Sequence, residues 1–458
     1  MDTKKLRQKI LDLAIRGKLV PQDPNDEPAS VLLERIRTEK KQLIKEGKIK
    51  RSKKPATTDK SHYENPPFEI PESWEWVTLG EIFNMQAGKF IEASQIYNKN
   101  DISHPYPCYG GNGLRGYVSS YNRNGSFPII GRQGALCGNI NFTQGYFYAT
   151  EHAVVVDTFT YTDEVWATYF LIQLNLNQYA TATAQPGLSV KKISEVLMPL
   201  PPFQEQKRIV AEIEKWFSFI DNIKDETKEL ELLIKKTKSK ILDLAISGKL
   251  VPQDPNDEPA IELLKRINPN FVPCDKSHYE NASFEIPDNW CWATLGSIGK
   301  WQSGATPSRM RKDYYGGEIP WLKTGDLNDG FITDIPETIT QLALSETAVK
   351  LNPAGSILIA MYGATIGKVG ILTMPATTNQ ACCACVSHNG IEQMYLFYFL
   401  LSHKEEFICH GGGGAQPNIS KEKITETIIP IPPLKEQCRI VQAIDSIFEI
   451  LNSITAEL

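Results

Sequence analysis

Four stretches of this chain combine residue types that do chemistry in other proteins. Asn65–Phe68 reads NPPF, the pattern with which amino-group DNA methyltransferases hold a target amine. Gly363–Lys368 reads GATIGK and resembles a phosphate-binding loop. Cys382–His388 contains three cysteines and a histidine, which are common metal ligands. Lys40–Lys54 is a basic run that could contact phosphates or remain solvated at the end of a helix.

Two of these stretches lack the spacing that their chemistry needs. GATIGK is one residue short of a phosphate loop, and Val369 follows it where Ser or Thr would be needed. No second ligand pair at zinc-finger spacing accompanies Cys382, Cys383, Cys385 and His388, and these cysteines lie in an apolar, strand-like run. We therefore predict no metal site, no disulfide framework and no catalytic constellation.

Composition limits the class of protein. The chain has 458 residues, a formal net charge of −5 and 41% hydrophobic residues, which suits roughly two to four soluble domains. A protein that grips nucleic acid unaided usually carries a basic excess, so phosphate attraction must come from local patches or a partner. The chain has no run of ~18 apolar residues and begins without an apolar signal region. These features predict a cytoplasmic protein without a membrane partner.

One module occurs twice in the sequence. Ile10–Ala29 recurs 231 residues later as Ile241–Ala260, and the replacement of Arg16 by Ser247 is the only difference. Two further blocks recur, Pro199–Phe217 as Pro430–Phe448 at the same offset, and Asp59–Gly80 as Asp275–Gly296 at an offset of 216. The first copy therefore holds 15 extra residues ahead of the last block.

A single long helix is predicted from about residue 203 to 247. Its apolar residues recur at steps of three and four over about five heptads, and at about 1.5 Å per residue it would span roughly 65 Å. The same pattern reappears 231 residues away, split between the two ends of the chain. The seam positions, which we also expect to support subunit docking, are Ile209, Ile213, Trp216 and Ile220 centrally, Ile440, Ile444 and Ile447 near the C-terminus, and Leu6, Ile10 and Leu13 near the N-terminus.

A heptad seam needs a partner seam, and the split copy supplies one. We predict an α+β fold in which two mixed α/β domains are joined and separated by long antiparallel coiled-coil helices. The order of the pieces predicts a pseudo-two-fold, circularly permuted repeat, and an ordinary dimerising coiled coil is the alternative. The predicted segments are helical regions at 1–30, 201–260 and 431–458, and globular domains at 31–200 and 261–430.

The two globular halves share a frame and differ in their loops. Each ends in a short helix that begins after Ser189 or Ser420 and leads to a proline-rich exit. By contrast, Tyr106–Gly125 has no evident counterpart in Ile319–Thr338. Because polar, aromatic and glycine-rich loops are common sites of recognition, the halves look like two binding surfaces with different targets.

The repeat also argues against the methyltransferase pattern. The second copy of that block reads NASF at Asn281–Phe284 and so loses both prolines. No glycine-rich strand-to-helix turn for a methyl donor precedes either copy. We therefore favour an extended structural segment there. Core packing is the expected role of the repeated tryptophans, Trp74, Trp76, Trp290 and Trp292.

Together these residues resemble one known family, the specificity subunits of type I restriction–modification enzymes. The resemblance covers essentially the whole chain and rests on the permuted duplication, the block LDLAI-GKLVPQ and the IP-W frame before each variable half. It also rests on the proline exit followed by EQ-R-IV, at Glu205–Val210 and Glu436–Val441. No single motif among these would be specific, but the combination is.

The resemblance implies a non-catalytic protein with two target-recognition domains, each reading one half of a bipartite, asymmetric DNA site. The helices would fix the length of the unread spacer. It further implies docking of two methyltransferase subunits and two restriction/translocase subunits. No cofactor is then expected in this chain, because S-adenosylmethionine, ATP and magnesium would bind the partner subunits.

The family supplies no short motif for base contacts, so the candidate DNA-binding residues follow from side-chain chemistry. Arg and Lys read guanine in the major groove, and Asn and Gln read adenine. The candidates in the first domain are Asn112, Arg115, Arg132, Gln133 and Gln185. Those in the second domain are Arg309, Arg311, Lys323, Tyr362, Lys368, Gln416 and Asn418.

Two other functions are weighed beside this one. An amino-methyltransferase would show methyl-donor binding by the isolated chain. A scaffold with two peptide- or sugar-binding heads would not confer sequence-selective DNA protection when methyltransferase subunits are added.

Overall fold

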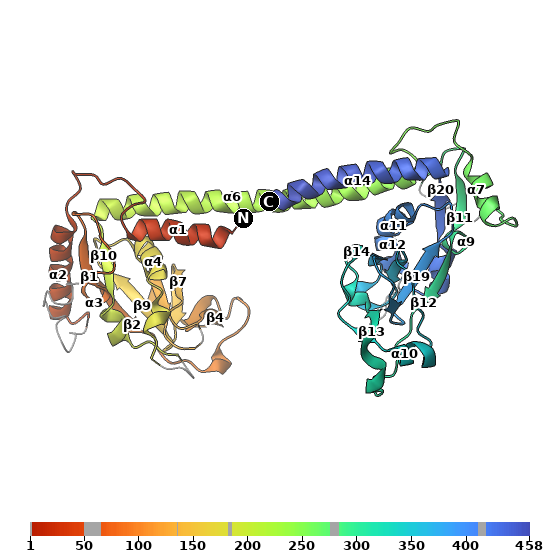
Figure 1. Cartoon of the computed structure of the whole chain (residues 1–458). Helices are drawn as coiled ribbons and strands as arrows, with labels where there is room; N and C mark the ends of the chain where they lie inside the picture. The colour runs from red at the N-terminus through yellow and green to blue at the C-terminus, as the bar shows by residue number, and fades with distance from the viewer. Residues whose placement is uncertain (1, 50–65, 135, 182–185, 275–283, 411–417) are drawn as a thin grey trace. The chain divides into compact units, whose positions relative to one another are not determined.

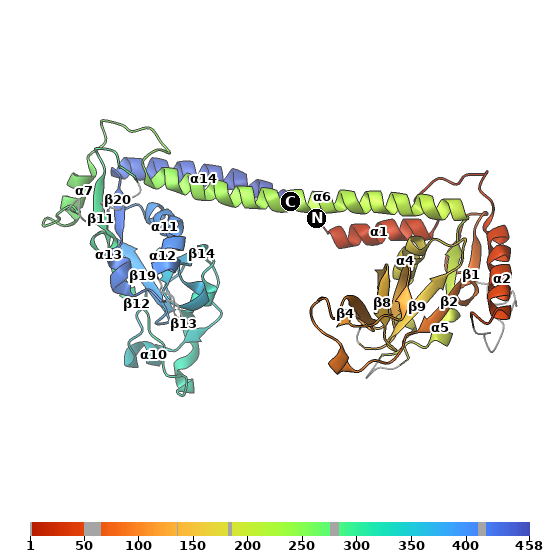
Figure 2. The same cartoon turned by 180° about the vertical axis from the view of Figure 1, so that it is seen from behind.

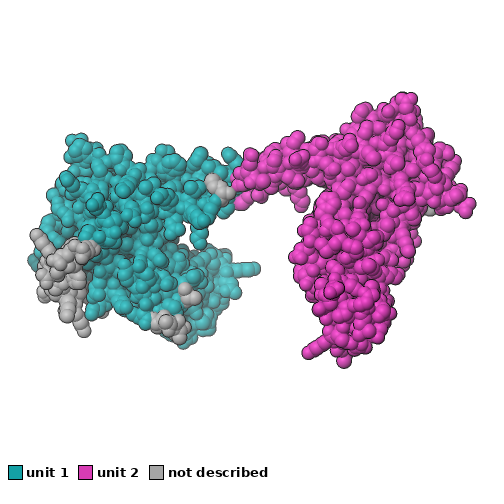
Figure 3. Space-filling view, viewed as in Figure 1, with its two compact units in different colours: residues 1–226 teal, residues 227–458 magenta. Residues whose placement is uncertain are grey.

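The computed structural model describes residues 2–49, 66–134, 136–181, 186–274, 284–410 and 418–458. Its contacts divide the chain into unit 1, Met1–Glu226, and unit 2, Thr227–Leu458, which Figure 3 colours separately. Helix α6, Phe203–Ile246, is 44 residues long and contributes its first part to unit 1 and the rest to unit 2. The prediction of one long helix here is therefore confirmed.

Unit 1 is a mixed α/β domain (Figure 1). Its helices are α1 Thr3–Ile15, α2 Ala29–Lys45, α3 Leu79–Ile82, α4 Glu164–Gln173 and α5 Val190–Ser194, with 3-10 turns η2 Ala93–Gln95 and η3 Leu176–Tyr179. Its strands are β1 Glu75–Thr78, β2 Phe83–Ala87, β3 Tyr106–Gly110, β4 Gly113–Val118, β5 Arg123–Asn124, β6 Phe127–Gly131, β7 Ile140–Thr143, β8 Tyr146–Ala149, β9 Ala153–Thr158 and β10 Leu197–Leu200. They form two four-stranded sheets, β2-β9-β6-β7 and β4-β3-β8-β5, and the antiparallel pair β1-β10.

The core of unit 1 lies on one face of the β2-β9-β6-β7 sheet. Val154 and Val156 of β9 pack with residues of α1, α2, α4 and the start of α6. Val155 points to the other face and packs with Ile129 and Phe147. This alternation follows from the period of two along a strand, and it places the second sheet on the side away from the helices.

Unit 2 repeats this plan with additions (Figure 2). Its helices are α7 Ala260–Ile267, α9 Leu295–Ile298, α10 Gln341–Glu346, α11 Gln393–Ser402, α12 Lys404–His410, α13 Lys421–Glu426 and α14 Leu434–Glu457, with turns η4 Lys312–Tyr314, η5 Thr324–Asp326 and η6 Gly363–Thr365. Its strands are β11 Cys291–Thr294, β12 Gly299–Ser303, β13 Tyr315–Leu322, β14 Gly330–Ile332, β15 Thr338–Ile339, β16 Ile357–Ala360, β17 Val369–Leu372, β18 Thr377–Thr378, β19 Cys382–Ser387 and β20 Ile428–Ile431. The sheets are β12-β19-β16-β17-β14, β15-β13-β18 and β11-β20.

The middles of the two units correspond more closely than their sequences indicate. β3 pairs in parallel with β8, and β13 pairs in parallel with β18. The Thr150 N–H donates to the Tyr109 carbonyl at 2.9 Å, and the Asn379 N–H donates to the Leu322 carbonyl at 2.9 Å. The expectation that Tyr106–Gly125 lacks a counterpart is therefore wrong for its first strand. Backbone hydrogen bonds hold this frame, so its side chains can diverge without losing it.

Each unit also contains the same polar junction at the start of its long helix. In unit 1, Trp74 Nε1 donates to Glu205 Oε2 at 2.9 Å and Gln22 Nε2 donates to Glu205 Oε1 at 2.6 Å. Arg208 pairs there with Asp26. In unit 2 the same contacts join Trp290, Gln253 and Glu436, and Arg439 pairs with Asp257.

Each unit packs a terminal helix beside its part of α6. In unit 1, Arg7 pairs with Asp221, and Asp26 pairs with Arg208. Going from Arg7 to Asp26, the partner on α6 moves back from Asp221 to Arg208. The N-terminal segment therefore runs antiparallel to α6. In unit 2, Lys238 donates to Asn452 of α14 at 2.5 Å, which is the contact equivalent to Arg7 with Asp221.

The seam residues divide by exposure. Ile209, Ile213, Ile220, Ile440 and Ile444 are buried, and Ile10, Leu13 and Ile447 are half-buried. Trp216 is 42% exposed and Leu6 is 40% exposed, so the expectation that they pack in the seam of their own unit is corrected. The next residue, Phe217, lies against α1 instead, with the Arg7 guanidinium 4.4 Å from its ring centre. Trp216 follows Ile213 by three residues and Phe217 follows it by four. Both steps suit a helical seam, so the sequence alone did not distinguish Trp216 from Phe217.

The 15 extra residues of the first copy begin in α2, which has 17 residues where α7 has 8. Within the basic run, Lys40 donates to the Gly80 carbonyl, and burial lowers the pKa of its ammonium. Lys40 is therefore a packed residue rather than a solvated phosphate contact. Residues 50–54 of the run lie outside the described residues.

Several smaller expectations are met. The Ser189 side chain caps α5 by accepting from the Lys192 N–H, and Ser420 caps α13 in the same way. Trp74, Trp290 and Trp292 are buried in the cores, whereas Trp76 is half-buried. By contacts, α1 belongs with unit 1 and α14 with unit 2, so the structure groups the five predicted segments into two units.

Candidate nucleic-acid interface

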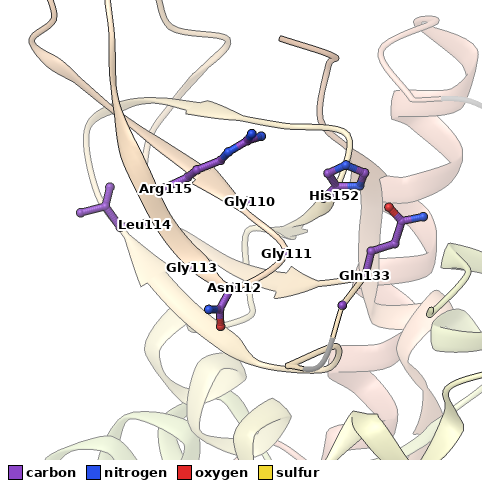
Figure 4. A pocket seen from close by; sticks show the side chains of 9 residues that line it. Gly110, Gly111, Asn112, Gly113, Leu114, Arg115, Gln133 and His152 are labelled. Atoms are coloured by element: carbon purple, nitrogen blue, oxygen red, sulfur yellow. The ribbon is translucent and has the colours of Figure 1, made fainter. Parts of the chain in front are cut away.

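A hollow of about 540 Å³ opens on the second sheet of unit 1. It is lined by the turn between β3 and β4, by the turn after β6, and by His152 (Figure 4). Three candidate residues, Asn112, Arg115 and Gln133, meet at this hollow. We call this surface face 1, and its lining residues are Gly110, Gly111, Asn112, Gly113, Leu114, Arg115, Gln133, Gly134 and His152.

The glycines of face 1 allow two turns to approach closely. A Cβ on Gly131 would lie 2.0 Å from the Gly111 carbonyl oxygen, and one on Gly111 would lie 2.5 Å from the Gln133 carbonyl oxygen. Any side chain at either position would force the turns apart. The glycine-rich sequence of this loop therefore holds Asn112 and Gln133 near each other.

The polar side chains of face 1 are left available. Asn112, Arg115 and Gln133 are exposed, and none of them makes a side-chain hydrogen bond or ion pair with another residue in the described ranges. Arg132 precedes Gln133 in the chain, and its Nε is buried without a hydrogen-bond partner. Unpaired donors at a surface are suited to bind an external ligand with hydrogen-bond acceptors.

Unit 2 presents an equivalent surface. The backbone of Gln133 bridges Gly187 in unit 1, and the backbone of Tyr362 bridges Asn418 in unit 2. By the matched strand pairings, Lys323 takes the place of Gly110. We use face 2 for these positions and the paired side chains beside them: Arg309 and Lys323 with Glu337, Thr306 with Gln380, and Tyr362 with Asn418.

The cations of face 2 are paired with a carboxylate. Arg309 Nη2 donates to Glu337 Oε2 at 2.9 Å, and Lys323 Nζ donates to Glu337 Oε1. The hydrogen bond from Lys323, with the one from Arg309, holds the pKa of the Glu337 carboxyl below its ordinary value. Arg309 and Lys323, predicted separately, thus meet through a residue that the sequence analysis did not single out.

The remaining candidates of unit 2 are less closely gathered. Arg311 pairs with Asp313 and Glu346. Lys368 Nζ donates to the Leu327 carbonyl at 3.4 Å. Gln185 and Gln416 lie outside the described residues.

Sequence reasoning missed His152, Glu337 and Gln380. His152 and Gln380 lie in the segments that follow β8 and β18, and no motif marked either residue. Glu337 lies in Ile319–Thr338, whose divergence from Tyr106–Gly125 was a usable signal, and it reaches face 2 through the pairing of β13 with β15.

The cysteine-rich strand is structural. Cys382, Cys383 and Cys385 are buried in β19, and burial raises the pKa of the Cys383 thiol to about 12. The cysteines are therefore protonated at neutral pH and pack as small apolar side chains. In the part of the chain that the structure describes, no group of three or more His, Cys, Asp or Glu residues could hold a metal ion.

Comparison with known proteins identifies the family. A family model for the type I restriction modification DNA specificity domain matches residues 71–232 and 287–458, once in each repeat. The chain belongs to this family. The EcoAI specificity subunit of Escherichia coli is 28% identical over 98% of this chain and 90% of that protein. The EcoEI specificity subunit of the same organism is 26% identical over 99% of this chain and 90% of that protein.

The fold also matches a solved structure from work on assembly and conformational transition of the type I R-M system. Its TM-score is 0.57 at 17% identity, covering 85% of this chain and 94% of that chain. The chain is thus a specificity subunit of the type I restriction–modification class, which has a role in DNA recognition rather than catalysis. No helix in the described ranges is both long and apolar enough to span a membrane.

Proposed function

We propose that each unit of this specificity subunit reads one part of a bipartite, asymmetric DNA site, unit 1 through face 1 and unit 2 through face 2. One observation carries this proposal. The two faces lie at matched positions on the same backbone frame, yet Gly110 and Gln133 of face 1 are replaced by Lys323 and Tyr362 in face 2. A constant frame with divergent exposed side chains suits recognition of two different base sequences.

The helices would supply spacing and assembly. α6 runs from one recognition domain to the other as a continuous helix, so its length would set the unread spacer. The repeated antiparallel contacts, Arg7 with Asp221 and Lys238 with Asn452, support a pseudo-two-fold, circularly permuted pair of coiled-coil segments. Exposed apolar side chains on these helices, such as Trp216 and Phe219, would dock partner subunits.

The partners we propose are double-stranded DNA, two methyltransferase subunits and two restriction/translocase subunits. S-adenosylmethionine, ATP and magnesium would bind those subunits. The net charge of −5 supports this division, because methyltransferases closing around the DNA would share the phosphate contacts.

Long-read mapping of methylated adenines tests the proposal in cells with and without this gene. A two-part motif with a constant gap should be present with the gene and absent without it. The double variant Arg115→Ala, Gln133→Ala should relax base choice in one part only, and Tyr362→Ala should relax it in the other part. Variants of both units acting on the same part, or a motif that survives loss of the gene, would refute the proposal.

A further inference from the structure

Face 2 contains a three-residue cluster in which Glu337 joins Arg309 and Lys323. Glu337 accepts from Arg309 at one carboxylate oxygen and from Lys323 at the other. The side chains remain accessible, with exposed fractions of 55% for Arg309, 41% for Lys323 and 33% for Glu337. Two cations share one carboxylate here, so the cluster keeps a net positive charge at the surface.

An aromatic wall supports the arginine. The Arg309 guanidinium carbon lies 4.5 Å from the ring centre of Tyr315 and 5.0 Å from that of Trp321. Both rings are held in place, because the Tyr315 hydroxyl donates to the Pro307 carbonyl at 2.5 Å and Trp321 Nε1 donates to the Ala305 carbonyl at 3.1 Å. Cation–π contacts and the ion pair together restrict the guanidinium to one orientation.

The cluster leaves part of the guanidinium free. Glu337 takes one N–H of Nη2, and Nε and Nη1 of Arg309 make no hydrogen bond within the described residues. Whichever N–H of Nη2 is taken, one adjacent pair of N–H groups, Nε with Nη2 or Nη1 with Nη2, stays free. A planar guanidinium with free N–H groups matches O6 and N7 of guanine in the major groove, which is the commonest specific contact of arginine with DNA. Lys323, in the place that Gly110 takes on face 1, puts the cluster at the recognition surface.

We propose that Arg309 reads a guanine in the part of the site bound by unit 2, and that Glu337 is a positioning residue that orients Arg309 for this contact. The inference rests on the proposed function and deepens it by naming the base class. Without the carboxylate, Arg309 and Lys323 would repel each other, and Arg309 would be free to sample other acceptors, including phosphates.

The first test replaces Arg309 in the assembled methyltransferase complex. Arg309→Lys keeps the charge and loses the planar fork. Adenine methylation of DNA substituted at each position of the motif should then lose discrimination at one guanine by roughly tenfold or more. Arg266→Lys is the matched control, since Arg266 is an exposed arginine of the same unit paired with Glu258, and its motif should stay that of the wild type.

The second test replaces Glu337 in the same complex. Glu337→Gln removes the charge with little change of shape, so discrimination should fall at that same guanine and nowhere in the other part of the motif. Binding to DNA without the motif should become tighter, and its dependence on salt should steepen by about one released counterion. A variant that merely folded poorly would lose binding to all DNA alike.

Four outcomes would overturn the inference. They are an unchanged motif in both variants, loss of discrimination at a base other than guanine, equal loss in both parts of the motif, or an Arg309→Lys effect limited to salt-dependent affinity. In each case the wild-type complex would still methylate a two-part motif, and the absence of that motif would instead refute the proposed function.

Discussion

Faces 1 and 2 share two matched backbone positions, Gly110 with Lys323 and Gln133 with Tyr362, and they differ in whether their cations are paired. On face 1, Arg115 and Gln133 have no polar partner among the described residues. On face 2, Arg309 and Lys323 are held by Glu337. The frame depends on main-chain hydrogen bonds, so each face can carry different side chains on the same fold.

The polar junctions at the starts of α6 and α14 keep the same side chains in both units, unlike the two faces. Trp74, Gln22 and Glu205 in unit 1 make the contacts that Trp290, Gln253 and Glu436 make in unit 2. Both glutamates are almost fully buried, so every donor around them must be matched. Side-chain identity is retained where side chains hold the structure together.

The largest expected effect tests whether the two junctions are equivalent. Trp74→Ala should destabilise unit 1 by about 3–5 kcal/mol, because it removes a buried aromatic ring and the donor to Glu205 Oε2. Trp290→Ala should cost unit 2 a similar amount. Hydrogen–deuterium exchange of peptides from each unit would measure both effects separately.

Trp74→Phe is the control for that prediction. It keeps an aromatic ring in the core while it removes the Nε1 donor and part of the ring volume, so its cost should fall to about 1–3 kcal/mol. A large loss of protection in one unit and none in the other would break the equivalence of the junctions.

An intermediate effect concerns the turn beneath each face. Gly131→Ala places a Cβ 2.0 Å from the Gly111 carbonyl oxygen and should destabilise unit 1 by about 1–3 kcal/mol. The matching residue of unit 2 is already Ala360, which accepts from the Gly367 N–H as Gly131 does from Gly138. Ala360→Gly should therefore cost only about 0.5–1 kcal/mol, through added flexibility of the unfolded chain. Exchange rates of β6 and β16 would measure the pair, and equal costs would contradict the difference in packing.

The smallest effect concerns pH and should be shared by both junctions. Burial raises the pKa of Glu205 and of Glu436 above the ordinary value of 4.5. The folded state therefore binds a proton at each glutamate more tightly than the unfolded state does. This proton binding contributes fully to the free energy of unfolding below pH 4.5, and the contribution is lost as pH rises through the folded pKa. Unfolding free energies from urea titrations should therefore fall over this window more in the wild type than in Glu205→Gln.

Glu436→Gln should reduce the same slope in unit 2. Glu72→Gln, at an exposed glutamate outside the junction, should leave the slope of the wild type unchanged. A Glu205→Gln slope equal to that of the wild type would mean that the buried carboxyl titrates normally.

Periodicity and self-comparison determined much of this protein in advance. The 231-residue repeat, the long central helix, the serine caps of α5 and α13 and the structural role of the cysteine strand all follow from local sequence. The family was recognisable for the same reason, since its repeated blocks are those whose side chains must be retained. The choice of Trp216 over Phe217 went wrong because both positions satisfy helical spacing, and the tertiary contacts of Phe217 with Arg7 and Tyr169 decide between them.

Tertiary structure alone decided which polar residues meet. Asn112, Arg115 and Gln133 come together because a parallel pairing of β3 with β8 and close glycine turns bring separate segments to one hollow. Glu337 joins Arg309 and Lys323 because β15 pairs with β13. Backbone hydrogen bonds between strands bring these distant residues together, and a residue can make such bonds whatever its side chain. The amino-acid sequence therefore carries no local pattern that predicts these contacts.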